Sequence, residues 1–337
     1  MVQAPNPTRA MKIHLTAALF AAATIGAIAQ PAKPAPAAAP PAQPAQPAEP
    51  FQTPALLVEK EGAFKKAWIV AATKTAIRYR ETEVSVDTKD ARISEFGAIF
   101  LYEPKEYSAA MDLYQSRKYE EAKAEFIKVK ERFKPIMPME NSPAALAAFY
   151  EMECLRRLGD FEGLSAALGK FIKDPLTRET QLGQIELYVL WDAVRTKSWD
   201  RLDILARERA TTKLPGDQRA QVGYCHGLAL EGLNRPDDAL FAYHTAMTAD
   251  AGATEELARQ AALRILAIHK ADAEVQHAIK VWGTEDERPN SRGYSHLTEA
   301  GAVAALFEMS LGAGTPLPSE LKSFLKYKPK VDVAVTP

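Results

Sequence analysis

The 337-residue chain has few of the residues from which catalytic and metal sites are built. It contains two cysteines and six histidines, and the histidines are scattered along the sequence. It has no glycine-rich phosphate loop, Cys-x-x-Cys pair, His-Glu-x-x-His helix or Gly-x-Ser-x-Gly turn. Glu151 and Glu153 are two residues apart on an expected helix and therefore point in different directions. These absences predict that the protein is not an enzyme and uses no metal or cofactor.

An excess of charge of either sign is also missing. Lysine and arginine number 42 against 43 aspartate and glutamate residues, which gives a formal net charge of −1. A general nucleic-acid binder normally has a basic excess. We therefore expect no nucleic-acid partner.

The N-terminus lacks an apolar run of the roughly 20 residues that a membrane-spanning helix needs. A short basic segment at residues 11–14 is followed by an apolar run at residues 15–25 and by small residues before position 30, as in a secretory signal peptide. We expect residues 1–29 to be that signal, with cleavage after Ala29 and with Met11 as an alternative start; an uncleaved anchor is the other interpretation. The pattern predicts an exported protein of the periplasm or cell envelope of a bacterium, without an integral membrane span.

Two different segments follow the signal. Residues 30–56 are rich in alanine and proline, carry almost no charge, and are expected to form an extended polyproline spacer. Residues 57–103 then contain short β-prone runs separated by polar breaks, which predict a small curled sheet or SH3-like half-barrel. The four strands are expected at residues 68–70, 76–80, 84–86 and 98–101.

Residues 104–327 show helical periodicity, and a helix-turn-helix pattern recurs in them. The pattern is most complete at residues 221–250, where Gly227 allows a close helix approach and Ala239 and Tyr243 form the second helical face. Positions equivalent to Ala239 occur at Ala122, Leu164, Leu202 and Ala278. This pattern resembles the tetratricopeptide repeat (TPR) family.

The resemblance implies a mainly α fold: an α-solenoid of about five helical hairpins, capped by C-terminal helices and preceded by the small β unit. A generic helical bundle is the alternative. Cys154 and Cys225 fall in first helices two repeats apart, so we expect packed thiols and no disulfide. Residues 328–337 are expected to be a disordered tail.

In the TPR family the first helix of each hairpin lines a concave face, so the resemblance also implies a partner-binding groove. Aromatic and arginine side chains together suit an apolar peptide with acidic character or a free C-terminus. The alternative is that several of these aromatics pack between repeats or lie beneath the C-terminal helices. The expected groove residues are Tyr107, Tyr114, Phe149, Tyr150, Arg156, Arg157, Tyr188, Trp191, Arg195, Tyr224 and Arg264.

The sequence thus predicts an exported, non-enzymatic scaffold that binds a protein or peptide partner through this groove. The alternative is a self-assembling structural subunit of an envelope complex, in which the chain forms a homo-oligomer. Fold resemblance alone does not name the partner.

Overall fold

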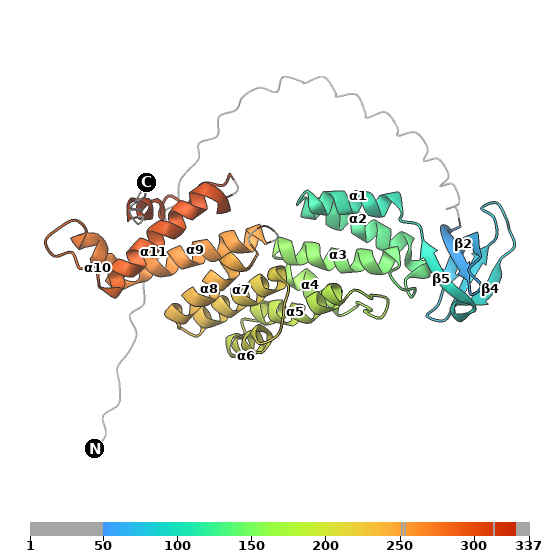
Figure 1. The fold of residues 1–337 in the computed structure, drawn as a ribbon, viewed down its shortest axis with the longest axis horizontal. Helices are drawn as coiled ribbons and strands as arrows, with labels where there is room; N and C mark the ends of the chain where they lie inside the picture. The colour runs from blue at the N-terminus through green and yellow to red at the C-terminus, as the bar shows by residue number, and fades with distance from the viewer. Residues whose placement is uncertain (1–49, 251, 253, 313, 328–337) are drawn as a thin grey trace, which may run out of the picture. The chain divides into compact units, whose positions relative to one another are not determined.

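The computed structural model describes residues 50–250, 252, 254–312 and 314–327, which are drawn in colour in Figure 1. The expected signal, residues 30–49 of the expected spacer and the tail lie outside the described residues. Within them the chain forms an antiparallel sheet followed by helices, as the sequence predicts (Figure 1).

The sheet has five strands in the order β4-β3-β2-β1-β5, with every neighbouring pair antiparallel. Alternating residues of β1 are buried, since Ala55 and Leu57 face the core while their neighbours are partly exposed. This period of two is typical of a sheet that covers a core with one face. The strands are β1 (Thr53–Glu59), β2 (Phe64–Ala72), β3 (Ala76–Arg80), β4 (Lys89–Arg92) and β5 (Phe96–Leu101).

Two features of the sheet differ from the sequence prediction. The first strand, β1, begins inside the segment that was expected to be spacer. The strand expected at residues 84–86 is wrong: Val84 and Val86 are 88% and 87% exposed in the connection between β3 and β4. Valine favours strands only where a neighbour and a core are available, and here the charged segment β4 pairs with β3 instead.

The buried face of the sheet packs on the first helices. Leu57, Ile69 and Ile77 share a hydrophobic cluster with Phe126 and Phe133. Because these apolar side chains are shared between sheet and helices, the sheet forms one packed core with α1, α2 and α3, separate from the core of the later helices.

Eleven α-helices follow the sheet in the described residues. Each of the first ten contacts the next along the chain, and odd-numbered helices also contact one another, as α5 with α7, α7 with α9, and α9 with α11. They are α1 (Lys105–Gln115), α2 (Tyr119–Arg132), α3 (Pro143–Leu158), α4 (Phe161–Leu168), α5 (Glu179–Arg195), α6 (Trp199–Ala210), α7 (Gly216–Gly232), α8 (Pro236–Ala249), α9 (Glu255–Ala271), α10 (Ala273–Val281) and α11 (Arg292–Leu306). Shorter helical turns are η1 (Ile93–Glu95), η2 (Lys134–Ile136), η3 (Phe307–Leu311) and η4 (Lys322–Tyr327).

The turns inside four helix pairs have the same backbone geometry. Each turn contains a residue with a positive φ, two positions before the second helix begins. The backbone N–H of the following residue donates to the carbonyl of the residue five positions before it, as at a Schellman helix end. The fifth pair, α9 and α10, departs from this, because Asp272 between them has a φ of −72°. The left-handed residues are Arg117, Gly159, Lys197 and Asn234.

The recurring positions of the sequence pattern lie in the second helix of each pair. Ala122, Leu164, Leu202, Ala239 and Ala278 are all buried. The close approach expected in the α7–α8 pair is also present: a Cβ added to Gly227 would lie 2.4 Å from the ring of Tyr243. The local pattern therefore predicted how each pair packs.

Both cysteines are free and buried, as expected. Burial raises the pKa of the Cys154 thiol to about 12, and it raises the pKa of Cys225 as well. Because the thiolate is the reactive form, both side chains act here as packed apolar groups.

Candidate functional site

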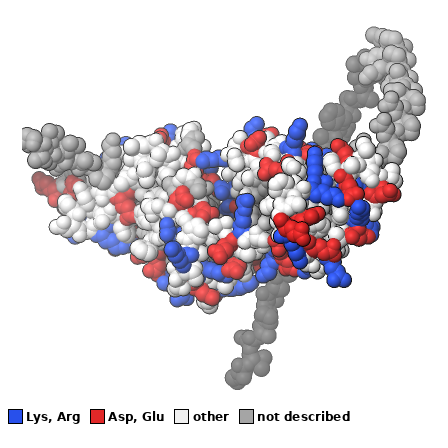
Figure 2. Space-filling view, turned by 45° about the vertical axis from the view of Figure 1, so that its right-hand side comes forward, with Lys and Arg blue, Asp and Glu red and all other residues white. Residues whose placement is uncertain are grey.

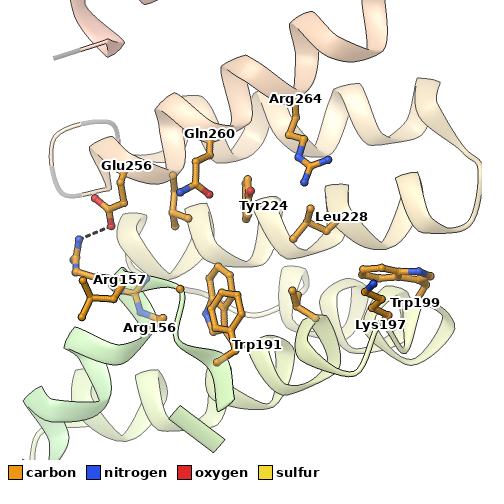
Figure 3. Close-up of a pocket in the computed structure, with 15 residues that line it drawn as sticks. Arg156, Arg157, Trp191, Lys197, Trp199, Tyr224, Leu228, Glu256, Gln260 and Arg264 are labelled. Atoms are coloured by element: carbon orange, nitrogen blue, oxygen red, sulfur yellow. Dashed lines mark hydrogen bonds and ion pairs between the residues drawn. The ribbon is translucent and has the colours of Figure 1, made fainter. Parts of the chain in front are cut away.

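A cavity of about 370 Å³ lies between the end of α3, α5, α7 and α9 (Figure 3). It contains five of the eleven predicted groove residues: Arg156, Arg157, Trp191, Tyr224 and Arg264. We call this the inner cavity. Its four main helices are all odd-numbered, and three of them, α5, α7 and α9, contact one another in series.

One wall of the inner cavity is aromatic. The rings of Phe161 and Trp191 are stacked with centroids 5.1 Å apart, and the ring of Tyr224 lies 6.2 Å from Trp191. The Trp191 indole N–H donates to the Gln221 side chain at 3.1 Å, so its polar atom is already satisfied. Leu228, one turn after Tyr224, extends the apolar surface (Figure 3). This wall suits a planar or branched apolar side chain.

The opposite wall is a stripe of polar residues on α9. Glu256, Gln260 and Arg264 are four residues apart and therefore share one helix face (Figure 3). Of these three, the sequence predicted only Arg264. The turn residue Lys197 and the neighbouring Trp199 also border the cavity and were missed. The spacing of the α9 stripe was visible in the sequence, but which face of α9 turns inward was not.

Arg157 closes one end of the cavity by joining three elements. Its guanidinium donates to Tyr114 Oη at 3.1 Å, to Tyr119 Oη at 3.4 Å and to Glu256 Oε1 at 2.6 Å. Although burial and the adjacent Arg156 oppose the charged form, the Tyr114, Glu256 and Glu153 side chains raise the pKa of Arg157. Its charge is thus already paired, and Arg157 holds α9 against α1 to α3 instead of offering a free cation.

Arg156 differs most from its predicted role. Its side chain is 2% exposed, and its guanidinium donates twice to Glu153, at 3.0 Å and 2.8 Å. The Tyr188 hydroxyl donates to the same carboxylate at 2.8 Å. Burial alone would raise the pKa of Glu153, but Arg156 outweighs burial and holds that pKa below its usual range. Arg156 therefore lies beneath the cavity as part of a buried ion pair.

Two cations at the other end remain accessible. Arg264 has a side chain 49% exposed and forms a long ion pair, of 3.6 Å, with the Glu231 carboxylate. Lys197 is exposed, and no acidic side chain of the described residues is recorded as its ion-pair partner. Both side chains are exposed enough to bind an anionic group that enters the cavity, although Arg264 also pairs with Glu231.

The remaining six predicted groove residues lie elsewhere. Tyr107 and Phe149 are buried, and Tyr114 and Tyr150 are half-buried, in a cluster of mutually contacting rings around α1 to α3. Tyr188 is buried beneath the inner cavity, and Arg195 pairs with Asp192 and Glu162 outside it. The structure therefore does not bring the eleven residues into one groove, because rings on neighbouring helices pack against each other first.

Charges on the molecular surface are mixed. Figure 2 shows basic and acidic side chains interspersed over the face it draws. In the part of the chain that the structure describes, no group of three or more histidine, cysteine, aspartate or glutamate side chains could hold a metal ion. None of the described helices is long and apolar enough to cross a membrane.

Comparisons of the chain with protein-family models, with curated proteins and with solved structures gave no match. The site is therefore interpreted from its own geometry.

Proposed function

We propose that this protein is an exported, non-enzymatic scaffold that binds a peptide segment of a partner in the inner cavity. The observation that carries the proposal is the pairing of an aromatic wall with two accessible cations. Phe161, Trp191 and Tyr224 supply the wall, and Arg264 and Lys197 supply the cations.

The helical arrangement supports a TPR-like solenoid as the scaffold. Four helix pairs share one turn geometry, and α5, α7, α9 and α11 contact each other in series. In such an architecture the first helices form a continuous inner surface, and each repeat contacts mainly its neighbours. In a solenoid the inner cavity would open on that surface, because α5, α7 and α9 are all first helices of their pairs.

Export is supported by the sequence of residues 1–29, with its basic start, short apolar run and small residues. The alanine- and proline-rich residues that follow would then separate the folded part from the site of anchorage or translocation. We place the protein in the periplasm or envelope of a bacterium on this basis.

The cavity chemistry defines the ligand class. An apolar side chain fits against the rings, while guanidinium and ammonium groups bind a carboxylate through charge-assisted hydrogen bonds. A peptide ending in an apolar residue supplies both groups, since its terminal carboxylate lies next to its last side chain. A peptide with an internal acidic residue beside an apolar one is the second form of the same chemistry.

The test is a selection of peptides displayed with free C-termini on the mature chain, residues 30–337. A selected peptide is then measured by fluorescence anisotropy against the Lys197→Gln/Arg264→Gln variant. Each lost charge-assisted hydrogen bond is worth about 1.5–3 kcal/mol, so we expect affinity to fall at least tenfold. Both side chains are exposed or half-exposed, so helicity and melting should stay unchanged.

The matched control is Arg195→Gln, which removes an arginine from α5 outside the cavity. Its affinity should equal that of the unaltered chain. If the cavity variant binds every selected peptide as tightly as the control does, the inner cavity is not the binding surface.

The second candidate function is a self-assembling envelope subunit. The observation that favours it is the uncovered edge of β5.

A further inference from the structure

β5 is an edge strand with one unpaired side. It pairs with β1, and at its end the Tyr102 N–H donates to the Pro54 carbonyl at 3.3 Å. Backbone groups of an antiparallel strand point alternately to its two sides. The backbone N–H and C=O groups of Ile99 and Leu101 therefore point away from β1. Within the described residues, these groups form no backbone hydrogen bond with another element.

The two edges of the sheet differ in chemistry. β4 is four residues long, and three of them are charged: Lys89, Asp90 and Arg92. Charges and shortness protect an edge from pairing with another chain. β5 is six residues long with the uncharged sequence FGAIFL, and Phe100 is 59% exposed. An apolar edge of this kind is normally covered by another element.

Nothing in the described residues fills the space beside β5. A cavity of about 560 Å³ runs along the strand, bounded on its other side by residues 138–141 and by Lys74. Met139 gives this cavity an apolar contact, and Glu140 gives it a carboxylate. The edge therefore opens onto a groove in which an extended segment can lie.

The C-terminal tail has the sequence that such an edge pairs with. Residues 331–335 read Val-Asp-Val-Ala-Val, so valines alternate with a smaller or polar residue. β-branched residues with a period of two favour a strand with one apolar face. Lys328 and Lys330 precede this run and complement the carboxylate of Glu140 in the groove.

We propose that residues 331–335 of one copy add as a sixth strand to the β5 edge of a second copy. Strand addition of this kind gains affinity from main-chain hydrogen bonds and specificity from alternate side chains. It would place the three valines on one face and Asp332 on the other.

The position of the last described element and the length of the tail favour a second copy over the same chain. The last described element, η4, packs on α11, at the other end of the row of helices from the sheet (Figure 1). The ten residues from Lys328 to Pro337 span at most about 35 Å when fully extended. Pairing one copy's tail with another's sheet is a head-to-tail contact, which builds an open chain of copies unless a rotation closes it.

The first test compares the mature chain, residues 30–337, with the same chain ending at Tyr327, by sedimentation over a range of concentrations. The longer chain should associate as concentration rises, and the shorter one should stay monomeric. Removal of the tail leaves all described residues intact, so folding is not at issue. A longer chain that stays monomeric, or a shorter one that associates equally, overturns the proposal.

The second test asks whether the contact is a strand. The probe is a labelled peptide of residues 328–337, added to the chain that ends at Tyr327. N-methylation of the amides of Asp332 and Ala334 removes donors on one side of the strand, and N-methylation of Val331, Val333 and Val335 removes those on the other. Loss of two edge hydrogen bonds should weaken binding about tenfold or more for one of these peptides and leave the other close to the unmodified peptide.

Equal affinity of the two methylated peptides would show docking without strand pairing and would overturn the proposal. So would binding that persists in a scrambled peptide with the three valines placed together. If the unmodified peptide binds while the longer chain stays monomeric, the tail pairs within its own molecule and the second copy is excluded.

Discussion

Replacement of Glu153 by glutamine tests how the region beneath the inner cavity is held together. Glu153 and Arg156 lie on the same face of α3, with side chains 8% and 2% exposed. The carboxylate accepts two hydrogen bonds from Arg156, one from the Tyr188 hydroxyl and a longer one, of 3.4 Å, from the Tyr114 hydroxyl. Glutamine keeps the size of the side chain but removes its charge, so the Arg156 cation would remain buried without a counterion.

The expected cost follows from that geometry. Removal of one partner of a buried ion pair typically costs 3–5 kcal/mol, because the other charge stays desolvated and unpaired. A stable domain has only about 5–15 kcal/mol in total. We therefore expect Glu153→Gln to lower the free energy of unfolding by about 3 kcal/mol or more. Urea unfolding followed by circular dichroism measures it.

A triple variant separates the ion pair from general packing. Glu153→Leu, Arg156→Met and Tyr188→Phe together remove the buried charges and the Tyr188 hydroxyl, while the Tyr114 hydroxyl keeps its hydrogen bond from Arg157. Apolar replacement of a whole buried pair is often neutral or stabilising, so the triple variant should recover most of the loss. Glu162→Gln is the surface control, since its side chain is 79% exposed; it should change stability by no more than about 1 kcal/mol. A Glu153→Gln variant as stable as Glu162→Gln would refute the reasoning.

Two further predictions concern packing and pH. Gly227→Ala should lower the free energy of unfolding in urea by about 1–3 kcal/mol, because the new methyl group would overlap the Tyr243 ring. The control is Gly169→Ala, whose Cβ would make ordinary contacts and should change stability by less than about 0.5 kcal/mol. Hydrogen bonds from two lysines lower the pKa of Glu81 to about 2 from its ordinary 4.5, so its stabilising effect is fully present above pH 4.5 and is lost as the pH falls toward 2. The difference in urea midpoint between the chain and Glu81→Gln should therefore shrink between about pH 5 and about pH 3, and a difference that grows on acidification would contradict the assignment.

Local patterns predicted the helix pairs well. The large residues Tyr119, Phe161 and Trp199, which stand three positions before the recurring small or apolar one, each begin the second helix of a pair, as Pro236 does. The fifth pair departs from this, because α10 begins at Ala273 and the equivalent residue, Val275, is the third residue of the helix. Helix ends, turns and the apolar face of a helix depend on residues within a few positions of one another. Such features can be recognised without knowledge of the fold.

The sheet shows where local patterns fail. Val84 and Val86 have strong strand preference, yet they lie in an exposed connection, while the charged segment β4 pairs with β3. The strand β1 was hidden beside the proline-rich segment, although it pairs with both β2 and β5 at the centre of the sheet. Which strands pair is decided by neighbouring strands that are distant in sequence, and the strand propensity of a residue changes with those neighbours.

By itself, the sequence determined the kinds of element, the small residues that let α7 and α8 approach, and the buried state of both cysteines. Only the tertiary structure decided which arginines stay accessible to solvent. Arg156 and Arg157 are neighbours on α3, but one is buried against Glu153 and the other is paired with Glu256 of α9, about a hundred positions further on. Arg264 alone among the cavity's arginines keeps a half-exposed charge. Charge pairing depends on distances of a few ångströms between elements, and those distances exist only once the helices have packed.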